Sequence, residues 1–125
     1  MEKCSHEEMT QQGYKIDLWD ALLLLETIPM PRGKSAGANA VRKAMYTVYD
    51  DLRGRIPDSN AEDLRSLEHA WKNELTGAMR SKAHYYCHQL STAWQHPEWT
   101  DEYKEECYHL CAFYSMLHDK FRDEL

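Results

Sequence analysis

The sequence contains 125 residues, enough for one domain to bury a hydrophobic core without obligatory disulfides or metal ions. Fifteen Lys and Arg against 21 Asp and Glu give a net charge of −6, which argues against a protein that binds duplex DNA through charge alone. Only two Phe accompany eight Tyr and four Trp, and such aromatic residues with a polar group suit half-buried positions and interfaces.

The N-terminal segment MEKCSHEEMTQQG has no apolar signal region, and we expect residues 1–14 to be flexible or loosely packed. The longest apolar run, residues 21–25, is far shorter than the about 20 residues that a membrane-spanning helix needs. Four cysteines without a secretion signal are typical of a reducing compartment. We therefore predict a cytoplasmic protein with no membrane partner, built as a single helical domain over residues 1–125.

Apolar residues recur at helical spacing along most of the chain, which predicts an all-α fold, a compact bundle of four to five helices. The first helix is predicted over residues 15–28, which contain four consecutive leucines and precede two prolines that a helix does not continue through. A turn-rich connector, residues 31–40, leads to a second helix that ends at Gly54. The apolar stripe of this second helix is Val41, Ala44, Met45, Val48 and Leu52.

The third helix is predicted over residues 60–95, with a capping box at Ser59 and Glu62. One straight helix of this length would measure about 54 Å at 1.5 Å per residue, so we expect a break or bend near Thr76 and Gly77. The last helix is predicted to start after Thr100 as N-cap and to form an antiparallel hairpin with the third. The predicted core consists of Trp19, Leu22, Leu25, Val41, Met45, Val48, Leu64, Trp71, Tyr86, Leu90, Leu110, Tyr114 and Phe121.

The ends of the chain are acidic, and no arrangement of residues indicates a catalytic mechanism. Carboxylates along the last helix can face a basic groove of a partner, imitate a row of phosphates and steer the encounter. We therefore predict a non-enzymatic interaction protein, a small acidic regulator or inhibitor of the kind that phages and mobile elements encode. Its partner would be a protein or nucleoprotein complex with a basic surface. The predicted acidic face consists of Glu98, Asp101, Glu102, Glu105, Glu106 and Asp119.

The segment 31–57 is basic, with six Lys and Arg against two acidic residues. We expect its charges to pair with the acidic last helix or to surround an interface. Direct nucleic-acid binding is the weaker interpretation, because the basic pairs lie a helix length apart. A homodimer stays open as an alternative. The basic residues are Arg32, Lys34, Arg42, Lys43, Arg53 and Arg55.

A zinc site is the first alternative function. If the third and last helices form an antiparallel hairpin, residues at the same height have numbers that sum to about 195. His84 then lies opposite Cys111, and His88 lies opposite Cys107. Two thiolates and two imidazoles are a suitable ligand set for tetrahedral zinc. The helical wheel opposes this interpretation, because it places the histidines away from the apolar face of their helix. No other cofactor is predicted.

A small helical ribonuclease is the second alternative, because such enzymes act through an Arg and a His. The sequence offers Arg65 with His69 and Arg80 with His84, each pair separated by three residues. This spacing places both members of a pair one turn apart on a solvated helix face, so the signal is weak.

Overall fold

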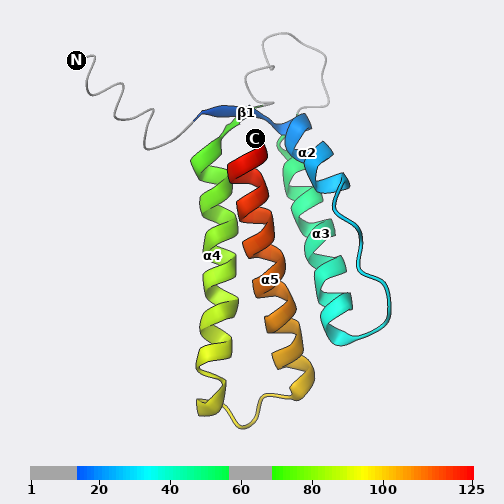
Figure 1. Cartoon of the computed structure of the whole chain (residues 1–125), viewed down its shortest axis with the longest axis vertical. Coiled ribbons are helices and arrows are strands. Elements are labelled where there is room, and N and C mark those ends of the chain that lie inside the picture. The colour runs from blue at the N-terminus through cyan, green and yellow to red at the C-terminus, as the bar shows by residue number, and fades with distance from the viewer. Residues whose placement is uncertain (1–13, 57–68) are drawn as a thin grey trace, which may run out of the picture.

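The computed structural model describes residues 14–56 and 69–125. These ranges contain four α-helices, one short 3-10 helix and a two-stranded sheet (Figure 1). The all-α helical bundle is confirmed, and the two strands are a small addition that the sequence did not predict. The elements in chain order are β1 (Lys15–Asp17), α2 (Leu18–Glu26), α3 (Ala36–Gly54), β2 (His69–Trp71), α4 (Lys72–Ser91), η2 (Ala93–Gln95) and α5 (Asp101–Glu124).

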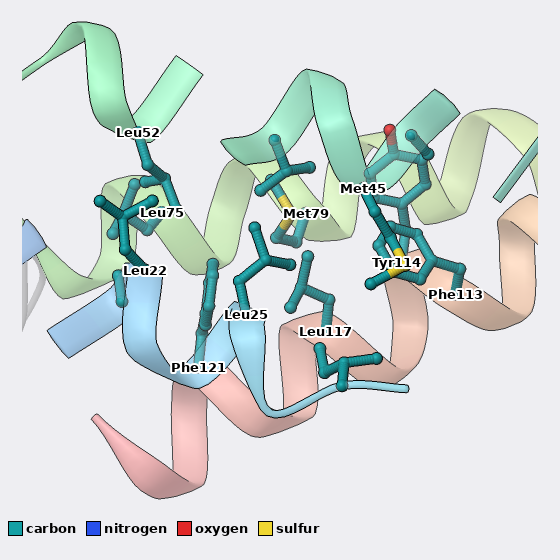
Figure 2. Close-up of a cluster of buried hydrophobic side chains, with 14 of the residues drawn as sticks. Leu22, Leu25, Met45, Leu52, Leu75, Met79, Phe113, Tyr114, Leu117 and Phe121 are labelled. Atoms are coloured by element: carbon teal, nitrogen blue, oxygen red, sulfur yellow. The ribbon is translucent and has the colours of Figure 1, made fainter. Parts of the chain in front are cut away.

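Helix α5 occupies the middle of the bundle and packs against both α4 and α3 (Figure 1). It begins where the sequence predicted, because the Thr100 hydroxyl accepts a hydrogen bond from the Tyr103 N–H at 3.0 Å. Its inner face includes Leu117 and Phe121, which have no exposed surface. In Figure 2 these two side chains lie beside Leu22 and Leu25 of α2. Helix α2 therefore closes the end of the bundle that contains the C-terminus.

Most of the predicted core is inside the protein. The buried members are Leu22, Leu25, Val41, Met45, Val48, Tyr114 and Phe121, and the half-buried ones are Trp71, Tyr86, Leu90 and Leu110. Leu64 lies outside the described residues. The prediction for Trp19 is wrong, since its side chain is 44% exposed and covers the guanidinium of Arg53 with 5.4 Å between that group and the ring centre. Leucines on the other side of α2 supply its buried face instead.

The first predicted helix begins three residues too early. Asp17 accepts a hydrogen bond from the Trp19 N–H at 2.8 Å and is the N-cap of α2, so the residues before it are extended. These residues form β1, which pairs antiparallel with β2, and Ile16 faces Ala70 in the register. Both of these side chains are buried. The small sheet therefore joins the start of α2 to the start of α4.

Helix α4 is continuous, and the predicted break near Gly77 is wrong. The break was expected because the third helix was taken to start near residue 60, whereas residues 69–71 form β2 and the helix begins at Lys72. Its 20 residues match the 24 of α5, so no bend is needed to fit the neighbouring helix. The predicted capping box at Ser59 and Glu62 lies outside the described residues.

The antiparallel hairpin of α4 and α5 is confirmed by contacts along its length. Near one end the Arg80 guanidinium lies 3.2 Å from the His118 Nε2 atom. Near the other end the Gln89 amide donates a hydrogen bond to the Tyr103 hydroxyl at 3.2 Å. Between them Tyr86 stacks on Tyr114, with ring centres 6.0 Å apart.

The start of α3 contacts α5 through a glycine. The Gly37 N–H donates a hydrogen bond to the Glu105 carboxylate at 3.2 Å. A Cβ atom at Gly37 would overlap the imidazole ring of His109, so any side chain there displaces that ring or separates the helices. The close approach of α3 to α5 therefore leaves no room for a side chain at residue 37 while the His109 ring keeps its position.

Replacing Gly37 tests this contact. We expect Gly37→Ala to lower the free energy of unfolding by about 1 kcal/mol, because the added methyl group displaces the exposed His109 ring from its place against α3. Gly77→Ala is the matched control, since no atom lies within 4 Å of its Cβ position. There the better helix propensity of Ala is expected to stabilise by about 0.5–1 kcal/mol. Urea unfolding measures both, and His109→Ala should restore the stability lost at Gly37. Equal effects at the two glycines would contradict the contact.

Tyr114 makes the stability of the fold depend on pH in the alkaline range. Burial raises the pKa of Tyr114 from 10.0 to about 12, and the neighbouring Tyr86 contributes to this rise. The unfolded chain therefore loses the Tyr114 proton at lower pH than the folded chain does. Its contribution to stability is complete below pH 10 and falls as the pH approaches 12. We expect Tyr114→Phe to flatten this fall in urea unfolding between these pH values, and an equally steep fall in that variant would exclude Tyr114 as its cause.

Candidate functional site

The turn between α4 and α5 carries the most exposed large hydrophobic side chain in the described ranges, Trp94, at 78%. The turn projects past the start of α3 at the end of the bundle opposite the C-terminus (Figure 1). Residues 91–103 contain three carboxylates and no Lys or Arg. The acidic tip, as we call this surface, consists of Trp94, Glu98, Trp99, Asp101 and Glu102.

Local contacts fix the conformation of the acidic tip. The rings of His96 and Trp99 stack with 4.0 Å between their centres, and the Trp99 N–H donates a hydrogen bond to the His96 carbonyl at 3.0 Å. The Trp99 ring in turn meets the ring of Tyr103 edge to face at 5.2 Å. The tip is therefore anchored to the first turn of α5, and Trp94 projects from an ordered turn.

Neighbouring groups also stabilise the negative charges of the acidic tip. His96 Nδ1 lies 3.1 Å from the Glu98 carboxylate. The pKa of Glu98 is lowered, first by a backbone hydrogen bond and then by this contact with His96. Asp101 and Glu102 stand in the first turn of α5, where the positive end of the helix dipole favours negative charge. All three carboxylates are exposed at the same end of the molecule.

The other predicted acidic residues do not belong to this surface. Glu105 accepts the hydrogen bond from Gly37 and so faces α3. Glu106 lines a cleft of about 340 Å³ between α3 and α4, together with Lys43 and Lys82. Asp119 lies 18 residues after Asp101, roughly 27 Å farther along the helix at 1.5 Å per residue. The predicted acidic face is therefore divided, and only its N-terminal part forms the tip.

Two arginines of the basic segment, Arg42 and Arg55, are bound to other groups of the protein. Arg42 donates hydrogen bonds to the carbonyls of Pro31 and Gly33, each at 2.7 Å, which fastens the connector to α3. The expectation that these charges pair with the last helix is wrong for Arg42 and for Arg55, because Arg55 pairs with Asp51 at 3.5 Å and with Glu74 of α4 at 3.1 Å.

The other four basic residues of the segment have different environments. Arg53 lies over the Trp19 ring, as described above. Arg32, Lys34 and Lys43 are exposed. With Arg42 and Arg55 occupied within the protein, the segment presents fewer cations to a phosphate backbone than its sequence suggested.

The four predicted zinc ligands are not brought together. His84 and His88 are exposed, Cys107 is buried and Cys111 is half-buried. The described ranges contain no group of three or more His, Cys, Asp or Glu that could hold a metal ion. Cys111 interacts instead with the thiol of Cys87, and its pKa is raised first by burial and then by this neighbour.

Of the predicted ribonuclease pairs, only Arg80 and His84 lie wholly within the described residues, one turn apart on α4. Arg80 contacts His118 on α5 rather than His84, which is exposed on α4. His118 Nδ1 lies 3.0 Å from the carboxylate of Asp119, so these three residues link the two helices of the hairpin. Of the other pair, Arg65 lies outside the described residues and His69 lies in β2.

A second surface, which sequence reasoning missed, lies between the end of α2 and the outer side of α3. We call it the connector groove, with a volume of about 690 Å³ and a mainly apolar lining. Tyr46 and Tyr49 lie outside the apolar stripe predicted for α3, and this was the signal that could have revealed it. The lining residues are Leu25, Glu26, Ile28, Pro29, Met30, Met45, Tyr46, Tyr49 and Asp50.

Comparison with protein-family models, with curated proteins and with solved structures finds no match to this chain. Across residues 14–56 and 69–125, no helix combines the length and apolar character that crossing a bilayer requires. The functional argument therefore depends on the surfaces themselves.

The different environments of the cysteines can be checked by thiol labelling. In a Cys4→Ser background, we expect Cys87 to react first because it is exposed. Cys107 is expected to react last, because burial raises the pKa of its thiol and restricts access of the reagent. Mass spectrometry of peptides at successive times gives the order. Labelling of Cys107 as fast as that of Cys87 would contradict the packing of α5.

Proposed function

We propose that this chain is a non-enzymatic interaction protein that binds a basic surface of a protein or nucleoprotein partner through the acidic tip. The observation that carries the proposal is Trp94, exposed within a stretch of 13 residues that has three carboxylates and no Lys or Arg. Leaving a large indole in water forgoes the free energy of burying it, and tryptophan is among the residues that dominate binding at interfaces.

The chemistry of the acidic tip suits a partner rich in Lys and Arg. The carboxylates of Glu98, Asp101 and Glu102 would steer a basic surface toward the tip and pair with its side chains. The faces of the Trp94 ring would then accept a Lys or Arg of the partner in a cation–π contact. A cluster of carboxylates on a small bundle competes with phosphate groups for such a surface, which supports action as a regulator or inhibitor.

The order of the tip supports a binding role further. Because the Trp99 ring is held between His96 and Tyr103, the turn has little conformational entropy left to lose when a partner binds. Trp94 would therefore act as a pre-positioned anchor, and the surrounding carboxylates as a polar rim.

Variants of the tip test the proposal by affinity capture from cells that express the protein. We expect Trp94→Ala, and the triple change Glu98→Gln, Asp101→Asn and Glu102→Gln, each to remove a partner that the unaltered protein retains. Capture should also weaken between 0.1 and 1 M salt, because the screening length falls from about 10 to 3 Å. Quantitative mass spectrometry of the captured proteins measures both effects.

The matched control neutralises three carboxylates at the opposite end of the bundle, with Asp20→Asn, Asp123→Asn and Glu124→Gln. Both triple variants raise the net charge from −6 to −3. Trp94→Ala should change the free energy of unfolding by less than about 0.5 kcal/mol, since the side chain is exposed. A partner retained by the tip variants, or lost equally in the control, would refute the role of the tip.

A further inference from the structure

The connector groove is a second apolar surface, distinct from the acidic tip. Its floor is formed by Leu25, Ile28 and Met45, which are at most 8% exposed. Figure 2 shows Leu25 and Met45 within the core cluster, so the floor is the outer side of the packed interior. Because these side chains are fixed by the core, the groove is formed before any ligand binds.

The rim of the groove is apolar and exposed. Tyr46 is 59% exposed, Met30 41% and Tyr49 36%. In the structure the connector between α2 and α3 comprises residues 27–35, which include Met30, and it runs along the outer side of α3 (Figure 1), away from α4. Aromatic rings with a hydroxyl and flexible thioether side chains are characteristic of protein-binding surfaces, because they adapt to an apolar partner and tolerate water when it is absent.

The backbone of the connector does not favour a partner that binds as an added strand. An added strand needs a regular row of N–H and carbonyl groups on the edge that it joins. In the connector, Pro29 and Pro31 have no N–H group, and the Pro31 carbonyl already accepts a hydrogen bond from Arg42. A helix satisfies its own backbone groups and needs only apolar contacts from the groove.

The charge of the groove indicates the polar side of that helix. The carboxylates that line it, Glu26 and Asp50, belong to exposed residues on opposite walls, one on α2 and one on α3. Arg42 of α3, which lies one turn before Met45 and Tyr46, is bound to the backbone carbonyls of Pro31 and Gly33. A helix with Lys or Arg beside its apolar stripe would place these cations at both walls.

We propose that the connector groove binds an amphipathic helix of a partner protein, whose apolar side chains fill the groove and whose Lys or Arg side chains face Glu26 and Asp50. This surface is independent of the acidic tip, so the two proposals can fail separately. Together they would let one small bundle contact a partner at two points.

The test uses the full chain with its tip carboxylates neutralised, so that a basic probe is not attracted there. The probe is a synthetic amphipathic helix of about 14 residues, roughly four turns, composed of Leu and Lys. The comparison peptide has Glu in place of every Lys. With isotopically labelled methionine methyl groups, we expect the Leu/Lys peptide to shift the nuclear magnetic resonance signals of Met30 and Met45, and the Leu/Glu peptide to leave them unchanged.

Variants of the groove complete the test. Tyr46→Ala should lower the affinity for the Leu/Lys peptide by about tenfold or more, and the double change Glu26→Lys with Asp50→Lys should do the same. Leu23→Ala removes an exposed leucine outside the groove and should leave the affinity unchanged. Asp123→Lys with Glu124→Lys is the control for net charge and should also have no effect. Thermal unfolding verifies that each variant is folded.

Three outcomes would overturn the proposal. The first is equal binding of the Leu/Glu peptide, because the groove would then show no preference for cations. The second is a shift confined to Met116, which lies outside the groove lining. The third is a shift of Met30 and Met45 with rising protein concentration in the absence of peptide, because a second copy of the chain would then occupy the groove.

Discussion

The bundle depends on the packing of α5 against two helices at once. Apolar residues of α5 recur at helical spacing, and the fully buried Leu117 and Phe121 meet α2, α3 and α4 at one level. Burial of each such side chain is worth about 1.5–3 kcal/mol, so this contact is a principal stabilising element of the fold. The hydrogen bond from Gly37 and the chain Arg80–His118–Asp119 then set how α3 and α4 are placed against α5.

This central position of α5 decides which of its charged side chains a partner protein can reach. In the second turn of the helix, Glu105 faces α3 and Glu106 lines the cleft between α3 and α4, because the helix is flanked on both sides. Only the first turn and the preceding residues extend beyond α3, and these carry the exposed carboxylates and Trp94 (Figure 1). The acidic tip is thus a consequence of the hairpin being longer than α3 at that end.

Local signals predicted local structure well. Thr100 as N-cap, the stripe of α3 and its end at Gly54 follow from hydrogen bonds and spacing within a few residues, so they can be read along the chain. The pairing of β1 with β2 could not be read in this way, because its two partners lie more than 50 residues apart. Trp19 was misplaced for a related reason, since the choice between neighbouring leucines and tryptophan depends on where α3 lies.

By itself, the sequence determined the helical class, the antiparallel hairpin and the excess of acid near the start of α5, because these depend on periodicity, caps and turns that act over a few residues. The tertiary structure decided which residues share a surface. Within the described residues it formed no metal-binding group from the predicted zinc ligands, it occupied Arg42 with backbone carbonyls, and it placed Met30 and Tyr46 in the lining of one groove. Such neighbouring residues come from different secondary-structure elements, so their contacts are determined only when the core packs.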